Sequence, residues 1–261
     1  MTRLHRPTTL SELTRLYAEL PDAMFLAGGA GVMLRLHKGP VPDDVIDTSR
    51  VEEIRGIQVG RFGTWLGALS TLRAVADDPL VRKSHPALAA ACAYGPPQIR
   101  GRASLGGSLA GRRFDILPAL LAHRCQVELI SHNQPSRRLR VVDFLEEKMA
   151  PGEVIRALHL PPRAEREHSL FRRIQTGRGD YVVCARLVLG DGVVSEVAVV
   201  VGDKSLGALH LSAVEEALAG RPLSSRPADL VPYALGGGST YLRSVASRVL
   251  RSWLEHLQTL D

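Results

Sequence analysis

Two short stretches decide how this sequence is interpreted, because each places a pair of glycines among small residues. The first is Leu26-Ala27-Gly28-Gly29-Ala30-Gly31-Val32, and the second is Ala103-Ser104-Leu105-Gly106-Gly107-Ser108-Leu109. Glycine lets the backbone turn sharply and lets a ligand approach it closely. Successive backbone amides in such turns form concave anion-binding sites, and the start of a helix adds to the effect. Two such loops could hold the pyrophosphate of a dinucleotide from two sides.

Neither loop matches the better-known nucleotide motifs. The spacing fits neither the dinucleotide fingerprint GxGxxG nor the Walker A pattern. The strands expected around the loops also do not form a regular series of alternating strands and helices. One glycine pair alone would be interpreted as a tight turn without a ligand. If a nucleotide binds, a fold other than the Rossmann fold must hold it.

Hydrophobic spacing predicts a mixture of short strands and helices along the first part of the chain. Helices are expected at residues 9–20, 64–75 (with Thr64 as the cap), 86–93 and 114–123, and in the first turns after Val32. Strands are expected at residues 24–27, 45–47, 57–60, 126–130, 137–142 and 152–160. Residues 98–110 are rich in glycine and are expected to form mainly a loop.

The pattern changes after Pro161-Pro162, which a charged stretch at residues 163–168 follows. Beyond it, residues 170–174, 181–189 and 193–201 predict successive strands, and Asp191-Gly192 is a strong hairpin signal. Helices are expected at residues 212–219 and 239–257. We therefore expect one domain at residues 1–162 and a second at residues 163–261, which combines a small antiparallel sheet with helices.

Composition narrows the classes of function. Cys92, Cys125 and Cys184 lie far apart without a CxxC motif, so neither a disulfide framework nor a metal centre is expected. The apolar runs are too short to span a membrane and no secretory signal is evident, which predicts a cytoplasmic protein. The net charge of +6 comes with only 5% aromatic residues, and this disfavours a nucleic-acid-binding platform. No known hydrolase or metal-ligand spacing occurs, so no catalytic residue is assigned.

The order of several short motifs resembles one known family. The motifs, in chain order, are Phe25-Leu26-Ala27-Gly28-Gly29, Val45-Ile46-Asp47, Ile57-Gln58-Val59-Gly60, Gln98-Ile99-Arg100 with the second glycine loop, Asp115-Ile116-Leu117-Pro118-Ala119-Leu120-Leu121, Pro151-Gly152-Glu153-Val154-Ile155, Leu160-Pro161, Phe171-Arg172-Arg173, Gly179-Asp180-Tyr181 and Tyr241-Leu242-Arg243. Together they resemble the flavin-binding subunit of the molybdenum hydroxylases, the family of xanthine dehydrogenase and carbon monoxide dehydrogenase. Each motif is weak alone, but the resemblance spans nearly the whole chain.

The resemblance implies an α+β fold, in which a two-lobed FAD-binding domain of the PCMH type precedes a small C-terminal α+β domain with an antiparallel sheet. It also implies an oxidoreductase subunit of a heteromeric complex. A large subunit with a molybdenum cofactor would oxidise the substrate, and a small iron–sulfur subunit would relay the electrons. FAD bound to this chain would pass them to an acceptor such as NAD or a quinone.

The resemblance further implies which residues contact FAD. The backbone of the first loop would hold the pyrophosphate, and part of the second loop would face it. Asp115 would bind hydroxyl groups of the ribitol or sugar. Three more positions match the family's flavin site. Thr64 matches a threonine of the third motif, Leu158 lies on a strand that the family places near the flavin, and Arg173 stands at a position that is usually lysine. The full set is Ala27, Gly28, Gly29, Ala30, Gly31, Val32, Ser104, Gly106, Gly107, Asp115, Thr64, Leu158 and Arg173.

Departures from the family pattern leave alternatives open. Ala30-Gly31 stands where the first loop is usually polar, and Gly111-Arg112-Arg113-Phe114 stands where an acidic residue and proline are usual. These changes support a flavin-free or degenerate scaffold or assembly subunit as the main alternative. A flavin reductase that works alone would need a proton donor, which the sequence does not identify. A basic nucleic-acid-binding protein is the remaining alternative.

Overall fold

The computed structural model describes residues 2–32, 36, 39–40, 42–147, 149–177, 179–205, 207–223 and 240–259. The chain forms two compact units. Unit 1 comprises Met1–Val81, Cys92–Arg112 and Arg124–Pro162, and unit 2 comprises Arg82–Ala91, Arg113–His123 and Arg163–Asp261. The last transition between units falls directly after the proline pair. Two short segments that precede this point in the sequence, Arg82–Ala91 and Arg113–His123, nevertheless belong to unit 2. The two compact units therefore do not coincide with the two continuous sequence ranges expected for the domains.

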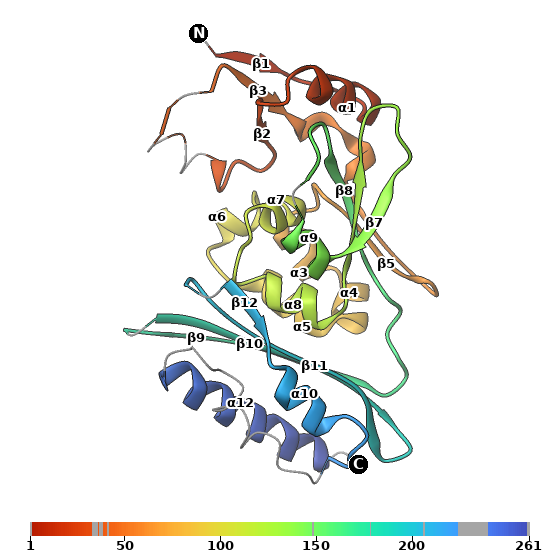
Figure 1. The fold of residues 1–261 in the computed structure, drawn as a ribbon, viewed down its shortest axis with the longest axis vertical. Coiled ribbons are helices and arrows are strands. Elements are labelled where there is room, and N and C mark those ends of the chain that lie inside the picture. The colour runs from red at the N-terminus through yellow and green to blue at the C-terminus, as the bar shows by residue number, and fades with distance from the viewer. Residues whose placement is uncertain are drawn as a thin grey trace. The chain divides into compact units, whose positions relative to one another are not determined.

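The first sheet of unit 1 is parallel and lies near the N-terminus (Figure 1). Its strand order is β1-β3-β2, with the bounds Arg3–His5, Asp44–Asp47 and Met24–Leu26. Helix α1 (Leu10–Glu19) begins after Thr9, whose side chain accepts a hydrogen bond from the amide of Glu12. Leu13 of this helix and Ile46 of β3 are fully buried in one hydrophobic cluster, which holds the helix against the sheet.

The second sheet of unit 1 is antiparallel and has the strand order β4-β5-β8-β6-β7. The strand bounds are Ile57–Gly60, Gly63–Gly67, Val154–Leu160, Gln126–Ile130 and Arg137–Arg140. The 3-10 helices η1 (Thr48–Arg50) and η2 (Glu52–Ile54) connect the two sheets along the chain. Helix α9 (Val141–Glu146) follows β7 directly.

The prediction of one helix at residues 64–75 is wrong. Thr64 lies in β5, opposite Leu160 of β8. The helix α3 (Leu72–Asp77) begins only after Thr71, whose side chain accepts a hydrogen bond from the amide of Ala74. A short apolar run fits strand and helix spacing equally, and pairing with β8 decides for the strand.

The prediction of a loop at residues 98–110 is also wrong for most of the segment. Helix α6 (Pro97–Arg100) and helix α7 (Leu105–Ala110) occupy it. The side chain of Ser104 caps α7 by accepting a hydrogen bond from the amide of Gly107. A Cβ at Gly106 would lie 2.7 Å from the Cβ of Ala68. Glycine at this position therefore allows helix α7 to pack closely on Ala68 and does not form a turn.

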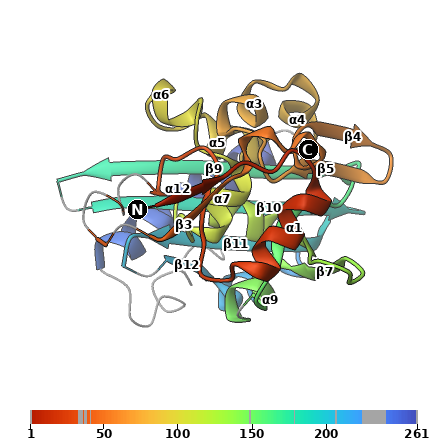
Figure 2. The same ribbon diagram turned by 90° about the horizontal axis from the view of Figure 1, so that it is seen from above.

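Unit 2 contains an antiparallel sheet with the strand order β12-β11-β10-β9, which Figure 2 shows from above. The strand bounds are Gly207–His210, Val193–Asp203, Gly179–Gly190 and Glu167–Thr176. Asp191 and Gly192 both have positive φ angles, 50° and 78°, and form the tight turn between β10 and β11 that the sequence predicts.

Helices cover both faces of this sheet. Helices α10 (Ser212–Leu218) and α12 (Thr240–Gln258) share one hydrophobic cluster with β10 and β11. Helix α8 (Leu117–Ala122) packs against the same strands, and Figure 1 shows it on the face away from α12. The helices predicted at residues 212–219 and 239–257 are confirmed. The α4 (Pro79–Ser84) and α5 (Pro86–Ala93) helices span a transition between the units. Of the helical turns predicted at residues 32–36, residues 33–35 lie outside the described residues.

Candidate functional site

A cavity of about 230 Å³ in unit 1 brings the two glycine loops together. The first loop contributes Ala27, and the second contributes Ser104, Gly106 and Gly107. Ala27 lies more than 70 positions before the other three residues in the sequence, and all four were predicted to contact the same ligand. The structure therefore places part of the predicted site around one cavity.

The first loop contacts the backbone that leads into the second. A Cβ at Gly28 would lie 1.5 Å from the carbonyl oxygen of Arg102, and the Nε of Arg102 donates a hydrogen bond of 3.3 Å to the carbonyl oxygen of Gly28. Gly29 has a φ of 76°, in the left-handed region. Within the described part of the chain, no hydrogen bond is recorded for the amides of residues 28–31. This loop therefore presents several N–H groups to an anion.

The amides of the second loop are used within the protein. The amide of Leu105 donates to the carbonyl oxygen of Ser70, and that of Gly106 donates to the carbonyl oxygen of Ala68, both at 2.9 Å. The amide of Gly107 donates to the Oγ of Ser104 at 3.2 Å. The second loop therefore forms a wall of the cavity, and the amides that can receive an anion lie in the first loop.

The remaining wall of the cavity is largely aromatic and aliphatic. Tyr17 and Phe25 meet edge to face, with ring centroids 4.5 Å apart. Burial raises the pKa of Tyr17, and the charge of Asp22 adds to this effect. The tyrosine therefore stays protonated at neutral pH and acts as a neutral side chain in the cavity wall.

One carboxylate, that of Glu153, also lines the cavity. The Arg137 guanidinium, 2.6 Å away, holds the pKa of this carboxyl below its usual range, against the opposing effect of burial. The amide of Ala150 donates to the same carboxylate at 2.7 Å. The carboxylate of Glu153 therefore remains ionised, and Arg137 balances its negative charge. A carboxyl group with a lowered pKa is a poor proton acceptor, so Glu153 has a structural role.

Other predicted site residues of unit 1 lie away from this cavity. Thr64 is 3% exposed in β5, and Leu158 is fully buried in β8 opposite Leu66. Neither is among the described residues that line the cavity. Val32 is partly exposed at the end of the first loop, next to residues outside the described part.

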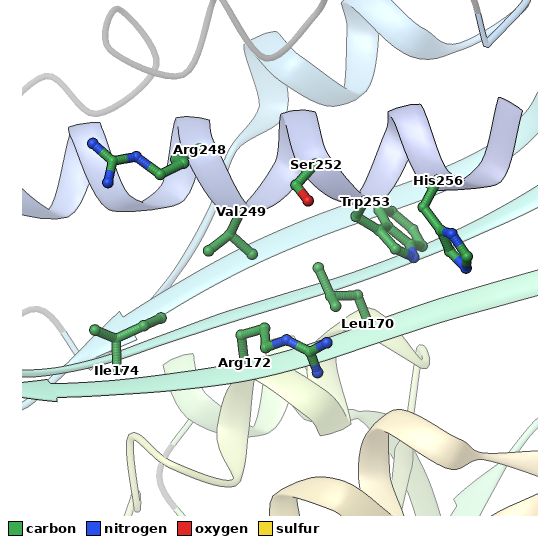
Figure 3. Close-up of a pocket in the computed structure, with 8 residues that line it drawn as sticks. All are labelled: Leu170, Arg172, Ile174, Arg248, Val249, Ser252, Trp253 and His256. Atoms are coloured by element: carbon green, nitrogen blue, oxygen red, sulfur yellow. The ribbon is translucent and has the colours of Figure 1, made fainter. Parts of the chain in front are cut away.

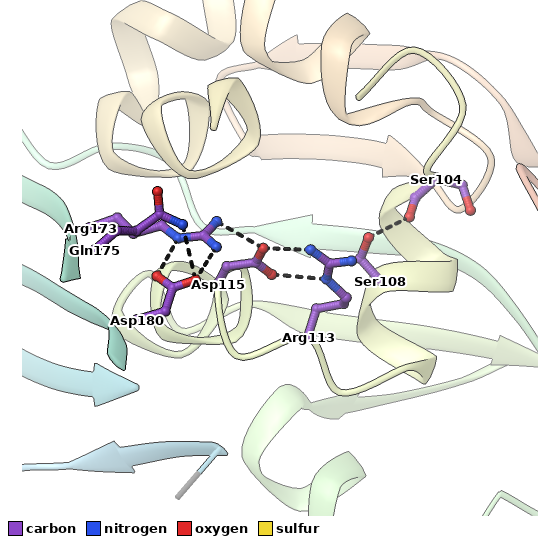
Figure 4. A network of polar contacts seen from close by, with 7 residues as sticks. All are labelled: Ser104, Ser108, Arg113, Asp115, Arg173, Gln175 and Asp180. Carbon is purple, nitrogen blue, oxygen red and sulfur yellow. Dashed lines mark hydrogen bonds and ion pairs between the residues drawn. The ribbon is translucent and has the colours of Figure 1, made fainter. Parts of the chain in front are cut away.

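Asp115 and Arg173 belong to unit 2, where they contact each other in a chain of ion pairs (Figure 4). Arg113 donates to both oxygens of Asp115, from Nε at 3.0 Å and from Nη2 at 2.6 Å. The Nη1 of Arg173 donates to Oδ2 of Asp115 at 3.2 Å, and its Nε donates to Asp180 at 2.7 Å. Figure 4 also shows Ser108 of unit 1, whose hydroxyl donates to the carbonyl oxygen of Ser104 at 2.9 Å.

The ion pairs of this chain shift the pKa values of two of its members. The hydrogen bond from Arg173 holds the pKa of Asp180 below its usual value, and the hydrogen bond to Asp115 raises the pKa of Arg113. Arg113 and Asp180 were not predicted as site residues from the sequence. Both nevertheless lie in segments that the family resemblance marks, because Arg113 belongs to the departure at residues 111–114 and Asp180 to the motif Gly179-Asp180-Tyr181.

The two arginines of the departure at residues 111–114 are both engaged within the protein. Arg112 has a φ of 49°, and its Nη2 donates to the carbonyl oxygen of Leu145 at 2.7 Å, in the last turn of α9. Arg113 is paired with Asp115 as described above. Their main contacts are therefore structural, and the positive charge they add is partly neutralised.

In the described part of the chain, no helix is long and apolar enough to cross a membrane. No group of three or more His, Cys, Asp and Glu side chains among these residues is arranged to hold a metal ion.

Comparison with known proteins identifies the family. The model of the FAD-binding domain in molybdopterin dehydrogenase matches residues 1–163. The chain belongs to this family. A relative within it is the xanthine dehydrogenase FAD-binding subunit of Escherichia coli, which is 30% identical over 176 residues, covering 63% of this chain and 59% of that protein. The aligned region thus spans less than two thirds of that relative.

A second relative and a solved structure extend the comparison. The carbon monoxide dehydrogenase medium chain of Hydrogenophaga pseudoflava is 28% identical over 195 residues, covering 71% of this chain and 67% of that one. A solved structure of carbon monoxide dehydrogenase from the same organism superimposes with a TM-score of 0.83 at 24% identity, over 95% of this chain and 93% of the other. The fold of this molybdopterin dehydrogenase family member is therefore the α+β fold expected from its sequence.

Proposed function

We propose that this chain binds FAD and acts as the electron-transfer subunit of a heteromeric molybdenum hydroxylase. The observation that carries the proposal is the cavity where the two glycine loops meet, with the amides of residues 28–31 unpaired in the described structure. Membership in a family of FAD-binding domains supports it. Residues 28–31, which carry these amides, directly follow Ala27 of the cavity lining, and the cavity itself has a largely apolar wall, a combination that suits a dinucleotide cofactor.

The residues present fit the cofactor in a defined way. The amides of the first loop would donate to the pyrophosphate, and α7 would form the facing wall through Ser104, Gly106 and Gly107. A volume of about 230 Å³ is below the usual range of small-molecule pockets, about 300–1,000 Å³. The cavity therefore suits only part of FAD. We propose the further contacts from the family resemblance, at Ala30, Val32, Thr64, Asp115, Leu158 and Arg173.

The ion pairs of Asp115 are compatible with its proposed role. An ionised carboxylate has about four lone-pair positions for hydrogen bonds. Arg113 and Arg173 occupy three of them in the structure. One position therefore remains for a hydroxyl group, and the two arginines hold the carboxylate in a fixed orientation.

FAD, when bound, supplies the redox chemistry, and the protein holds and orients it. We assign no catalytic residue, because electron transfer requires no acid or base from the chain, and the carboxylate among the described lining residues, that of Glu153, is held by Arg137. The electrons would come from the iron–sulfur clusters of a small subunit, which a large subunit with the molybdenum cofactor reduces. The relatives from Escherichia coli and Hydrogenophaga pseudoflava are an FAD-binding subunit and a medium chain, which supports a complex of this kind. The cytoplasmic location expected from the sequence stays a prediction.

The acceptor can be tested on the FAD-loaded chain. The chain would be reduced chemically without oxygen and mixed with NAD or with a water-soluble quinone, while the flavin absorbance is followed. We expect one of the two acceptors to restore the oxidised spectrum. Failure of both would contradict the proposed transfer to such acceptors, even if FAD remains bound.

The main alternative, a flavin-free scaffold subunit, makes a different prediction. The complex isolated with its partner subunits would then contain molybdenum and iron but no FAD. We expect instead about one FAD for each copy of this chain in that complex, as for a one-site cofactor.

A further inference from the structure

A groove in unit 2, distinct from the cavity in unit 1, runs between strand β9 and helix α12 (Figure 3). Its volume is about 590 Å³, within the usual range for sites that bind small molecules. Residues of the strand form its floor and residues of the helix form its wall. The described lining residues are Leu170, Arg172, Ile174, Arg248, Val249, Ser252, Trp253 and His256.

The groove exists because α12 leaves one face of β9 uncovered. Helix α12 buries one stripe of side chains in the hydrophobic cluster with β10 and β11, including Ala246, Leu250 and Leu254. The lining residues lie on the neighbouring flank of the helix. Alternate residues of β9 share one face of the strand, and Figure 3 shows Leu170 and Val249 pointing into the gap between strand and helix.

The length of the groove follows from the rise per residue of its strand and of its helix. The floor from Leu170 to Ile174 covers four strand steps, about 13 Å at ~3.3 Å per residue. The wall from Arg248 to His256 covers eight helix steps, about 12 Å at ~1.5 Å per residue. The two lengths agree, and they suit a single organic molecule of moderate size.

The charge of the groove is one-sided. Arg172 and Arg248 are exposed, and none of the described lining residues is acidic. The structure records no ion pair for either arginine among the described residues; the Nη1 of Arg172 donates only to the neighbouring carbonyl oxygen of Phe171, at 3.3 Å. Arg173, the next residue in the chain, is by contrast paired with two carboxylates. The guanidinium groups of the groove can therefore bind an external anion.

The groove also offers apolar area beside these charges. Leu170 is buried, and Val249 and Trp253 are half-buried and pack against the hydrophobic cluster of the unit. Trp253 presents a large flat ring next to His256. An anion that carried only a charge would leave this surface in contact with water, whereas an apolar or aromatic body would cover it.

We propose that this groove binds a small organic anion in which a carboxylate or phosphate group is joined to an aromatic or aliphatic body. The anionic group pairs with Arg172 at the floor of the groove, since a guanidinium group binds carboxylate and phosphate through paired hydrogen bonds, and Arg248, which points away from Arg172 in Figure 3, adds positive charge at the edge of the groove. The body lies over Leu170 and Val249 and against Trp253. The site is independent of the cavity proposed for FAD.

Calorimetric titration of the full chain, in the presence of excess FAD, tests the proposal. The probes are naphthoate, naphthyl phosphate and the neutral naphthalenemethanol. We expect at least one anion to bind at one site per chain and about tenfold more tightly than the alcohol, since a hydrogen bond between two charged groups is stronger than one to a neutral hydroxyl group. The two anions distinguish a carboxylate site from a phosphate site.

Matched variants locate the binding. Arg172→Gln should weaken binding of the anion about tenfold, Arg248→Gln should weaken it by a smaller factor, and Arg251→Gln, on the same helix but outside the described groove lining, should leave it unchanged. In a Trp65→Phe background, Trp253 is the remaining tryptophan, and its fluorescence should change on binding. Equal affinity for the anions and the alcohol, no binding of either anion, or equal effects of all three arginine variants would overturn the proposal. All variants should keep the thermal unfolding midpoint of the parent.

Discussion

The carbonyl oxygen of Arg102 occupies the space into which a side chain at Gly28 would project. A Cβ at Gly28 would lie 1.5 Å from this oxygen, and Arg102 also donates a hydrogen bond to the carbonyl oxygen of Gly28. The first glycine loop thus packs on the backbone that enters the second. The cavity between the loops depends on this backbone contact, so its shape should be sensitive to a single methyl group.

Gly28→Ala should separate the two loops, because the added Cβ meets a backbone atom that cannot rotate away. We expect a loss of unfolding free energy of about 1–3 kcal/mol, as for other over-packed sites, and at least a tenfold loss of FAD affinity, which is about 1.4 kcal/mol. Urea denaturation and FAD titration measure the two effects.

Gly31→Ala is the matched control in the same loop. A Cβ at Gly31 would meet no atom within 4 Å. Its unfolding free energy should change by less than about 1 kcal/mol, and FAD affinity should stay close to that of the parent. Equal losses in the two variants would show that loop contact with Arg102 does not control the cavity.

Ser104→Ala tests the wall formed by α7. The substitution removes the oxygen that accepts a hydrogen bond from the amide of Gly107, and it also removes a hydroxyl from the cavity. Loss of a helix cap should cost about 1 kcal/mol of unfolding free energy. FAD affinity should fall as well, because α7 forms the wall of the proposed site.

Thr71→Ala supplies the comparison, since Thr71 caps α3 in the same way and is not among the described residues that line the cavity. Its unfolding free energy should fall by a similar amount of about 1 kcal/mol, with FAD affinity unchanged. If both variants lost FAD affinity equally, the effect of Ser104 would reflect stability alone.

Asp115→Asn should be strongly destabilising. Asp115 is 4% exposed and carries the charge that both Arg113 and Arg173 face. Breaking a buried ion pair costs roughly 3–5 kcal/mol, and partial exposure of Arg113 reduces this to about 2–3 kcal/mol for the variant. Asp143→Asn removes a carboxylate that pairs with Arg140 in a more exposed position, and it should leave the denaturation midpoint nearly unchanged. Equal midpoints for the two variants would contradict the role given to Asp115.

His85 and His123 predict a fall of stability at mildly acidic pH. Their rings lie 5.3 Å apart in unit 2, and burial lowers the pKa of His85 to about 4 and that of His123 to about 3, with nearby positive charges adding to the effect. In the unfolded chain both return to about 6.5. The unfolded chain therefore binds more protons below pH ~6.5, and stability falls as the pH drops, by up to about 1.4 kcal/mol per pH unit for each histidine.

Urea denaturation at pH 7 and pH 5 measures this fall before most carboxylates titrate. His123→Gln should lower stability at pH 7 but reduce the difference between the two pH values. His132→Gln, which replaces a histidine outside this pair, should keep the full difference. A parent protein equally stable at both pH values would show that the buried histidines do not behave as described.

Local patterns in the sequence were sufficient for elements that depend on local chemistry. The turn at Asp191-Gly192 and the long helix ending near residue 257 are both found where the sequence predicts them. Residues 64–75 and 98–110 were predicted wrongly for a physical reason. Pairing of β5 with β8 and close packing of Gly106 on Ala68 decide their structure, and both contacts come from distant parts of the chain.

The features of the candidate site that depend on local sequence could also be predicted, and those that depend on distant contacts could not. The glycine pairs made it possible to predict that Ala27, Ser104, Gly106 and Gly107 share one ligand site, and the structure places them around one cavity. The sequence did not reveal that the amides of the second loop are used internally, because their acceptors are carbonyl oxygens near residue 70. The ion-pair partners of Asp115 were missed because charged residues alone do not specify which of them meet.

The most direct test of the account is the flavin content of the purified chain. Its visible spectrum would be recorded, the chromophore released by heat and identified by chromatography, and the apo form titrated with FAD. We expect released FAD at about one per chain, or uptake to that level, and a deficiency of FAD in the Gly28→Ala variant. A colourless chain that takes up no added FAD would contradict the central claim and would favour the flavin-free scaffold.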